Sequence, residues 1–453
     1  MSIERAHPRG RARGRAALRI ALAAAVLLVA CPGAAAAARS AAGSHAQRYV
    51  SPSGDDRNDG SRRRPWRTIR HAGARARPGG TIRVAPGHYR GAVQIRRQGA
   101  PGRRIRFVSE QRWGARLTAG SATAVTVVEI RGDRVTFEGF DVSGAGADGT
   151  AGINVEGSHV TVAHNRVHDL SAPCAQTGNG AAGIVAGGGL AGYRNHDVRI
   201  EANVVEDIGR GPRDGRCRLA HGIYAAVPRV TVVNNIVSRA RGDGITSWHA
   251  ASRLTVANNV AAMNGGAGIL IGSGDSGATA TGHVDTLVAN NIVEGNALYG
   301  ITESSDGVHP VGPGNRYLNN LAFANRGGGR GGPTGATAFS DGAVASGTIE
   351  ADPQFSPQVL DAARRYRVEP TSPAIDAGTT LGAPRYDFDG VRRPQGRCVD
   401  IGPHEFRSTG PWGLPSAGAV GGPGSASPVR AEIGAASMDV RAARCRLGGG
   451  LIG

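Results

Sequence analysis

Short runs of alternating apolar and polar residues recur along this chain, and each run ends at an asparagine. The clearest runs are VTVAHNRV, VRIEANVV, VTVVNNIV, LTVANNV, TLVANNIV and RYLNNLAF. Their asparagines in register are Asn165, Asn203, Asn235, Asn259, Asn291 and Asn320. Alternation with a period of two predicts short β-strands with one buried face.

A glycine followed by isoleucine precedes almost every run. These pairs start at Gly152, Gly183, Gly222, Gly244, Gly268 and Gly300, so the period is 22 to 39 residues. A regular unit with extra length confined to loops is typical of a solenoid. We therefore predict an all-β fold, a right-handed parallel β-helix in which each strand pairs with its copy in the next coil. The asparagines should form a ladder of stacked amides in one turn and adopt its left-handed backbone.

The pattern divides the chain into five zones. Residues 1–38 are a leader, 39–120 an N-terminal cap with the first coils, and 121–349 the body of repeats. Residues 350–406 form a closing segment, and the Gly/Ala/Pro-rich tail at 407–453 is expected to be disordered.

The leader has a basic start followed by the apolar stretch IALAAAVLLVAC, which is too short for a membrane span. This pattern predicts a signal peptide, with a cleavage site such as that after Ala38. Leu28 to Cys31 also fits a lipobox, which would make Cys31 a lipidated first residue. We expect a secreted protein under the first interpretation and one anchored to the cell surface by lipid under the second.

Export would place the cysteines in a compartment that permits disulfides. Cys174 and Cys217 lie in loops of neighbouring repeats and form one predicted pair, and Cys398 with Cys445 is the other. Free thiols are the alternative. We expect a monomer.

The net charge of +18 raises the question of a nucleic-acid partner. All 53 basic residues are arginine, which indicates a compositional bias spread over the surface, and part of the charge lies in the leader. No nucleic-acid-binding motif is present, so we predict no such partner. The 71 glycines and the low aromatic content fit many tight turns between strands.

Three stretches carry a resemblance to a known family. YVSPSGDDRNDGSRRRPWRTIRHA at 49–72, the repeats, and the closing motifs SPAIDAG and VDIGPHEF resemble secreted bacterial β-helix proteins related to family 9 pectate lyases. The resemblance covers residues 49–406 and implies the pectate-lyase-like fold. It says little about the substrate, because one scaffold carries many chemistries.

The resemblance also implies a calcium cluster in a pattern like D-D-G-[FI]-D and a lysine base one coil later. Here GDGIT keeps only Asp243, because Gly242 and Thr246 replace the other two acids. Leu270 stands at the lysine position, and the chain has no lysine. One carboxylate makes a poor calcium site, so we expect no cofactor and regard the calcium site as incomplete.

The same face of the β-helix offers another set of groups. The candidate catalytic residues are His221, Tyr224 and Asp243, with the imidazole or the phenol as acid or base and Asp243 orienting His221. The candidate substrate-binding residues are Trp248 as a sugar platform, His249, Glu303, Asn154, Glu156, and Arg218 and Arg241 as partners of a uronate carboxylate. Each of these residues also has a purely structural interpretation, as a turn residue or as a side chain that covers the surface of a strand.

Two hypotheses follow. The first is a carbohydrate-active enzyme, a lyase or hydrolase acting on an extracellular, uronate-containing polysaccharide. The second is a non-catalytic β-helix that binds glycans or is anchored at the surface. An enzyme requires His221, Tyr224, Asp243 and Trp248 to meet on one face.

Overall fold

The structure is a computed structural model. It describes residues 46–120, 125–144, 151–171, 181–187, 192–210, 219–249, 251–274, 282–327, 337–338, 342–357 and 363–407. The chain divides into two compact units, residues 1–44 and 45–453, and the first lies wholly outside the described residues. In the described part, no helix has the length and apolar character needed to cross a bilayer.

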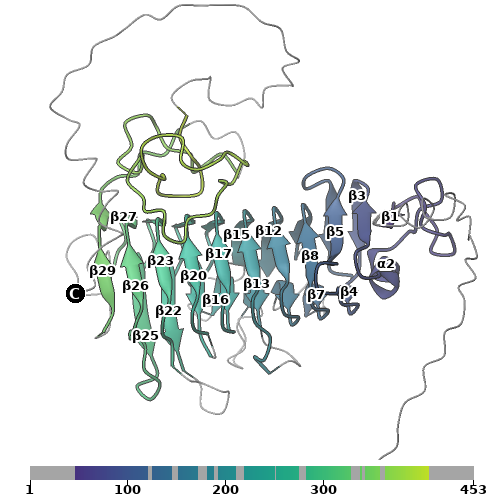
Figure 1. Ribbon diagram of the computed structural model, residues 1–453, viewed down its shortest axis with the longest axis horizontal. Helices are drawn as coiled ribbons and strands as arrows, with labels where there is room; N and C mark the ends of the chain where they lie inside the picture. Colours follow the sequence, from purple (N-terminus) through teal and green to yellow (C-terminus); the bar gives the residue numbers. More distant parts are fainter. Residues whose placement is uncertain are drawn as a thin grey trace, which may run out of the picture. The chain divides into compact units, whose positions relative to one another are not determined.

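Three parallel sheets, here called A, B and C, run side by side along one axis (Figure 1). From β2 onward, successive strands of the chain visit sheets A, B and C in turn, and each strand pairs with the equivalent strand one coil away. This is the connectivity of the predicted parallel β-helix. The strands of the described residues are as follows.

Sheet A contains β1 (Gln47–Val50), β2 (Thr81–Val84), β5 (Ile105–Ser109), β8 (Val135–Glu138), β11 (Thr161–Ala163), β14 (Arg199–Glu201), β17 (Thr231–Val233), β20 (Thr255–Ala257), β23 (Leu287–Ala289), β26 (Arg316–Leu318) and β29 (Val344–Ser346). Sheet B contains β3 (Gly87–Arg90), β6 (Ala115–Thr118), β9 (Asp141–Ser143), β12 (Arg166–Ser171), β15 (Val204–Arg210), β18 (Ile236–Ser238), β21 (Val260–Ala262), β24 (Ile292–Glu294), β27 (Leu321–Phe323) and β30 (Ile349–Glu350). Sheet C contains β4 (Val93–Ile95), β7 (Thr126–Ile130), β10 (Ala151–Val155), β13 (Ala181–Ala186), β16 (Ala220–Ala225), β19 (Ile245–Ser247), β22 (Ile269–Ser273), β25 (Ile301–Ser305) and β28 (Thr337–Ala338).

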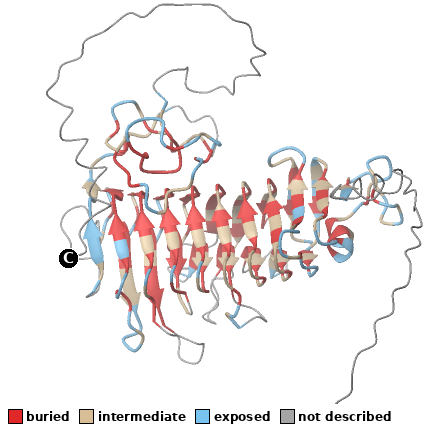
Figure 2. Ribbon diagram, in the orientation of Figure 1, coloured by how far each residue is buried: buried red, intermediate tan, exposed pale blue. Residues whose placement is uncertain are grey.

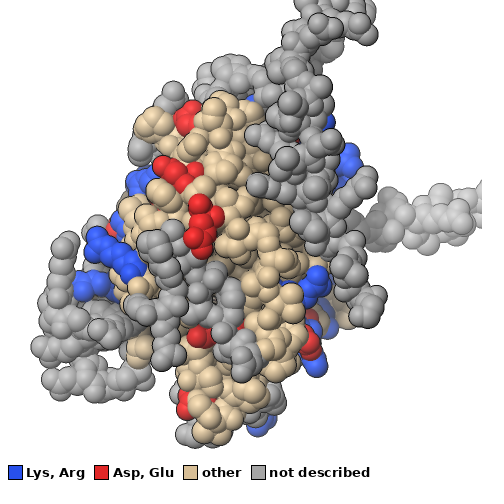
Figure 3. Space-filling model, turned by 90° about the vertical axis from the view of Figure 1, so that its left-hand side faces the viewer, with Lys and Arg blue, Asp and Glu red and all other residues tan. Residues whose placement is uncertain are grey.

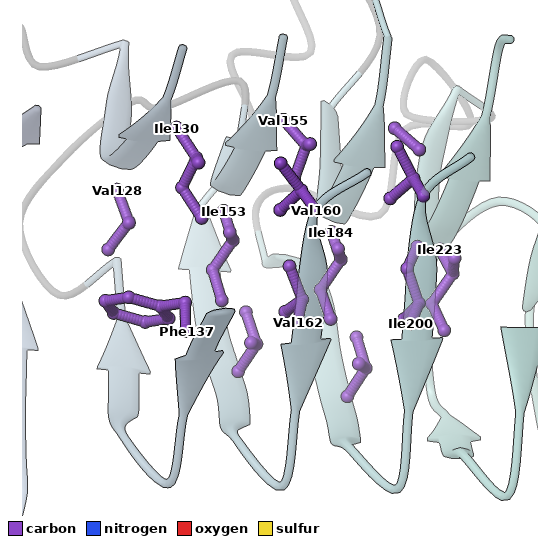
Figure 4. Close-up of a cluster of buried hydrophobic side chains, with 14 of the residues drawn as sticks. Val128, Ile130, Phe137, Ile153, Val155, Val160, Val162, Ile184, Ile200 and Ile223 are labelled. Carbon is purple, nitrogen blue, oxygen red and sulfur yellow. The ribbon is translucent and has the colours of Figure 1, made fainter. Parts of the chain in front are cut away.

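The core is a set of aliphatic columns that run through the coils. The isoleucines of the six Gly-Ile pairs stand in register, from Ile153 through Ile184, Ile223, Ile245 and Ile269 to Ile301. All six are at most 1% exposed. Figure 4 shows this packing, with Ile153, Ile184 and Ile223 facing Val162 and Ile200 of sheet A. The predicted inward column is therefore confirmed.

The glycine of the pair also faces the interior at Gly222 and Gly183, which explains why it is glycine there. A Cβ on Gly222 would lie 2.2 Å from Cγ1 of Val237 and 2.5 Å from the carbonyl oxygen of Gly244. The equivalent Cβ on Gly183 would lie 2.4 Å from Cγ1 of Val205. Because glycine and isoleucine both face inward, the strict alternation breaks here. The residue before the glycine is consequently turned to the outer face of sheet C.

The asparagine ladder lies in the turn between sheets A and B. From Asn165 to Asn320, each Nδ2 donates to Oδ1 of the next asparagine over 2.9–3.1 Å, and each backbone N–H donates to the same oxygen. The predicted ladder is confirmed. The expectation that these residues adopt the left-handed backbone was wrong, because the preceding residue does so: φ is 56° at Asn234 and 56° at Asn258.

The sequence reading missed a second, shorter ladder after sheet B. Asn264, Asn296 and Asn325 repeat the same amide stacking, with Nδ2 to Oδ1 distances of 2.9 and 2.8 Å. All three side chains are buried. These residues fix the second turn of the last coils in the way the main ladder fixes the first.

The closing segment packs on the outer face of sheet B in the later coils (Figure 1). Its Tyr366, Phe388 and Ile401 belong to one buried apolar cluster with Ile236, Val260 and their neighbours. Figure 2 colours parts of the closing segment as buried. Asn258 Nδ2 donates to the carbonyl oxygens of Asp400 and Gly402, and Asn290 Nδ2 donates to that of Thr379. Asn258 and Asn290 each precede a ladder asparagine and have the left-handed backbone. Their side chains therefore hold the closing segment in place.

The N-terminal segment caps the first coil. The helix α2 (Ile69–Arg75) lies against β4, the edge strand of sheet C, and a Cβ on Gly73 would lie 2.7 Å from the carbonyl oxygen of Gln94. The acidic loop before it forms turns: Asp55 accepts from the N–H of Arg57, and Asp56 accepts from Thr68. The Asp55 bond is that of an Asx-turn, and the Asp56 bonds tie the acidic loop to the start of α2.

Candidate active site

The outer face of sheet C carries the polar groups that the sequence singled out. His221 lies before the inward Gly222, and Tyr224 lies after the inward Ile223, so both side chains face outward from β16. Their rings stack with centroids 5.6 Å apart and an interplanar angle of 17°. The break in alternation at the glycine therefore places an imidazole beside a phenol.

Asp243 stands beside His221 in the next coil. His221 Nδ1 lies 3.3 Å from Oδ2 of Asp243 and 3.1 Å from its backbone nitrogen. An unprotonated Nδ1 can accept the backbone N–H, whereas a protonated Nδ1 can donate to the carboxylate. Both protonation states of this imidazole thus have a partner in Asp243. Each residue is 8% exposed, so the pair is largely shielded from water.

The other carboxylate oxygen of Asp243 is held by the following coil. Oδ1 accepts the backbone N–H of Ala267 at 2.7 Å. A Cβ on Gly266 would lie 2.2 Å from this oxygen, so glycine is needed for the close approach. The carboxylate is therefore fixed in orientation toward His221, and its catalytic role stays a prediction.

A second imidazole and a second phenol extend the cluster. His249 contacts Tyr224 edge-on, with ring centroids 5.8 Å apart, and its Nε2 lies 3.1 Å from the hydroxyl of Tyr193. The Tyr193 and His249 rings stack at 4.2 Å. Tyr193 was missed in the sequence because it lies in an irregular loop before β14, where no repeat fixes its position.

Trp248 belongs to the same face but lies over the next coil. A Cβ on Gly272 would lie 2.4 Å from its Cζ3, and one on Gly274 would lie 2.5 Å from its Cζ2. The indole is thus packed on Gly272 of β22 and on Gly274 just after it, and stays half-buried. Its role as a sugar platform remains a prediction.

Asn154 and Glu156 lie on the same sheet in an earlier coil. Asn154 stands in register with Val185, which stands in register with Tyr224, so two strand steps separate it from the cluster. Glu156 Oε2 lies 3.3 Å from Nε of Arg131, and Asn154 Nδ2 donates to Glu156 Oε1 at 3.3 Å. The Glu156 side chain is 6% exposed, and the role of both residues as substrate ligands stays a prediction.

Glu303 does not join this face. It stands in register with the buried Ile271, and its Oε1 accepts the hydroxyl of Tyr317 at 2.6 Å and Nδ2 of Asn315 at 2.8 Å. Tyr317 is fully buried, so these bonds direct the carboxylate toward the coil interior. The prediction of Glu303 as a substrate ligand is corrected to an interior polar role.

The predicted arginine ligands are only partly placed. Arg241 is half-buried, and its Cβ and Cγ lie close to Gly209 of the neighbouring coil. Arg218 lies outside the described residues. Cys31, Cys174, Cys217 and Cys445 also lie outside them. Cys398 is buried and disulfide-bonded, and its partner is outside the described part, so the pairing with Cys445 stays a prediction.

The residues around Asp243 do not fit a calcium site. Gly242 and Thr246 offer no carboxylate, and both oxygens of Asp243 already face donors, the N–H of Ala267 and Nδ1 of His221. Calcium takes six to eight oxygen ligands. Within the described ranges, the groups able to hold a metal lie elsewhere and do not include Asp243.

Those two groups have charge partners of their own. The first group consists of His159, His196 and Asp197. Arg229 binds both oxygens of Asp197, at 2.8 and 3.0 Å, and this pairing lowers the pKa of Asp197 to about 2. In the closing segment, Asp389 Oδ2 lies 2.5 Å from Arg367 and 3.0 Å from Nδ1 of His404. We assign neither group a metal, because arginine already pairs with Asp197 and Asp389, and Asp387 accepts backbone N–H groups of Asp389, Val391 and Glu405.

Comparison with known proteins decides the family. A family model described as the Pel9A-like right-handed beta helix region matches residues 48–331. The chain belongs to this family. The match spans the cap and nearly all the coils that carry the His221 cluster.

Individual relatives are more distant. The uncharacterized protein YwoF of Bacillus subtilis (strain 168) is 28% identical over 140 residues, which cover 28% of this chain and 30% of YwoF. The crystal structure of pectate lyase Pel9A matches 80% of this chain and 96% of its own, with a TM-score of 0.52 and 18% identity. A rhamnogalacturonan lyase matches 72% of this chain and 93% of its own, with a TM-score of 0.43 and 14% identity. At these identities the likeness concerns the fold.

Proposed function

We propose that this chain is an exported polysaccharide lyase that cleaves a uronate-containing polysaccharide without a bound metal. The arrangement of His221 between Asp243 and Tyr224 on the outer face of sheet C carries the proposal. Membership of the Pel9A-like family supports a carbohydrate substrate, because a member of that name is a pectate lyase. The absence of lysine from the sequence requires another base.

The proposed reaction is a β-elimination. In the tautomer whose Nδ1–H faces the Asp243 carboxylate, the free Nε2 of the neutral His221 takes the proton from C5 of the uronate, and the electron pair of that C–H bond forms the C4–C5 double bond. The C4–O4 bond breaks, and Tyr224 donates its phenolic proton to the leaving O4. The proton then passes from His221 back to Tyr224, which restores both groups.

The surroundings of the cluster suit this sequence of steps. Asp243 offers its carboxylate to the imidazolium that forms and stabilises the positive charge. His249 lies next to Tyr224, Tyr193 stacks on His249, and both offer hydrogen bonds to the sugar. Arg241 and Arg218 remain the candidates for pairing with the uronate carboxylate, because guanidinium binds carboxylates through two bonds.

The test is an ultraviolet assay for the unsaturated uronate product. The purified chain is incubated with polygalacturonate, alginate or a glycosaminoglycan, with calcium or with chelator. We expect absorbance to rise on one substrate and to persist in chelator. A rise that needs calcium would contradict the metal-free mechanism. No rise with any substrate would contradict the lyase and favour the glycan-binding alternative.

Variants locate the activity in the cluster. Y224F removes the proton donor and keeps the ring, and H221N removes the base. A matched histidine control is H88N, because His88 is exposed on sheet B, away from this face. Both cluster variants should lose activity while H88N keeps it.

Export is tested separately, on the mature protein. Mass spectrometry of the N-terminus distinguishes cleavage after a residue such as Ala38 from a lipidated Cys31. A protein that still begins at Met1 would contradict both forms of export.

A further inference from the structure

The positive charge of the chain is concentrated at one end of the β-helix. Residues 46–120 contain 18 arginines and four acidic residues, a net charge of +14. Residues 121–453 contain 28 arginines and 30 acidic residues. The expectation that arginine is spread evenly over the surface was therefore wrong. The excess belongs to the cap and the first coils.

Nearly all of these arginines reach solvent. Sixteen of the 18 are exposed, and the exceptions, Arg83 and Arg104, are partly buried. With four acids in the segment, most of the guanidinium groups have no local carboxylate. Figure 3 shows the opposite end of the β-helix, where acidic groups lie on the visible face and arginines lie mainly toward its edges.

Part of this basic surface lies in line with the His221 cluster. In sheet C the strand order β4, β7, β10, β13, β16 leads from the cap to His221. Strands lie about 4.8 Å apart, so the four steps span roughly 19 Å. Arg96 directly follows β4, and Arg70 and Arg75 belong to α2, which packs against that strand.

The outer face of sheet C between β4 and the His221 cluster does not repel an anion strongly. Its outward acids, Glu129 and Glu156, both face Arg131, at 2.6 and 3.3 Å. Val185, Asn154 and Gln94 complete the column that stands in register with Tyr224. A polymer held at the cluster and running along the axis would cross this strip and reach the arginines.

We propose that the arginines around α2 and β4 bind the distal part of the same anionic polysaccharide chain whose uronate is held at the His221 cluster. The partner is assigned by charge complementarity: a repeating carboxylate polymer presents acceptors along its length, and guanidinium groups bind carboxylates in bidentate fashion. The surface thus holds a long chain in the orientation in which it crosses sheet C. This inference rests on the proposed function for the identity of the polymer.

The test compares long and short ligands. Binding of long polygalacturonate and of a galacturonate trimer is measured at low salt by calorimetry, with H221N as background so that no turnover occurs. The triple variant R70Q/R75Q/R96Q should bind the long polymer roughly tenfold more weakly, since each exposed ion pair contributes little by itself. Affinity for the trimer, which cannot span both sites, should not change.

The control variant is R253Q/R316Q/R326Q, which removes the same charge from exposed positions in the later coils. It should retain the affinity for the long polymer. An equal loss in the control, or no loss in the cap variant, would overturn the proposal. Tighter binding of single-stranded DNA than of polygalacturonate would overturn the assigned partner. Thermal melting checks that all variants remain folded.

The two proposals can fail separately. If the ultraviolet assay shows no product but the cap variant still loses affinity for the long polymer, the basic surface stands and the lyase does not. If the protein with His221 intact forms product but R70Q/R75Q/R96Q in the H221N background binds long polymer as tightly as H221N alone, the lyase stands and the distal surface does not.

Discussion

The Nδ1 atom of His221 lies 3.3 Å from Oδ2 of Asp243, although the residues are 22 positions apart in the sequence. One coil of the β-helix separates them, so a step between neighbouring strands of sheet C brings them together. Asp243 also holds a hydrogen bond from Ala267 in the coil after that. Three successive coils therefore fix the geometry of one imidazole.

This relationship predicts different effects for the two partners. H221N should lower kcat by about 10² to 10⁴, the range typical for loss of a general base. D243N keeps the backbone N–H that His221 can accept but removes the charge that stabilises the imidazolium. It should lower kcat less, with KM nearly unchanged, because Asp243 positions the base and does not touch the substrate. Initial rates on the active polysaccharide measure both, and an unchanged kcat in D243N would contradict this role.

The asparagine ladder should carry a large share of the stability. N259A removes the acceptor for two donors of Asn235 and leaves the carbonyl of Val232 without its partner, all in a fully buried turn. Each buried group left unsatisfied costs about 1–3 kcal/mol. We therefore expect urea denaturation to show a free energy of unfolding lower by about 3 kcal/mol or more.

Its control is N154A, on the solvent-facing side of sheet C. That change should cost about 0.5 kcal/mol or less, as surface substitutions usually do. Equal losses for the two variants would mean that the ladder contributes no more than an outer-face asparagine.

The closing segment should make stability depend on pH through Asp400. Burial is the largest cause that raises the pKa of this carboxyl, to about 7, and the nearby Glu405 adds to it. In the unfolded chain the group titrates near 3.8. The folded state therefore holds the proton more tightly, and the stabilisation present below pH 4 is lost as pH rises through about 7.

D400N removes this titration. Compared with the parent, the variant should lose less stability between pH 5 and pH 8, by an amount on the order of 1–4 kcal/mol. Thermal or urea unfolding at several pH values gives the difference. Parallel pH profiles for the two proteins would show that Asp400 does not titrate in this range.

Attachment of the closing segment should depend on Phe388. This side chain is 1% exposed, packs in the apolar cluster on sheet B, and lies under the guanidinium of Arg112 at 4.8 Å. F388A should cost about 3–5 kcal/mol of local stability, the usual cost of removing a buried aromatic ring. Limited proteolysis should then cut the closing segment faster than in the parent protein.

Tyr386 provides the matched control, because it is an aromatic residue of the same loop that is 48% exposed. Y386A should leave the rate of proteolysis nearly unchanged. Rapid cutting in both variants would indicate that any change in this loop releases the segment.

The repeat itself was readable from the sequence. The Gly-Ile pairs and the asparagines recur at one point of every coil, and strands in neighbouring coils must stand in register if their apolar faces are to form one column. The inward isoleucines, the main ladder and the outward position of Tyr224 therefore follow from local alternation and spacing, whereas His221 faces outward because the inward Gly222 breaks the alternation. The left-handed residue was misplaced by one position, because the amide that stacks and the backbone that turns belong to neighbouring residues.

The outer face of sheet B shows what tertiary contacts add. One column runs through Arg116, Asp141 and Arg166 and then changes to Val204, Ile236, Val260, Ile292 and Leu321. The change marks where the closing segment covers the sheet. The alternation of a single strand cannot reveal this cover, because the covering residues lie far along the chain.

By itself, then, the sequence determined the coil, its inward columns and the outer face that carries the candidate site, since these depend on local periodicity. Tertiary structure decided that Asp243 points at His221, that Tyr193 and His249 join the cluster, and that Glu303 turns inward to Tyr317. It also decided which arginines share a surface in line with the site. Such relationships join different coils or irregular loops, and only the stacking of coils brings these residues within contact distance.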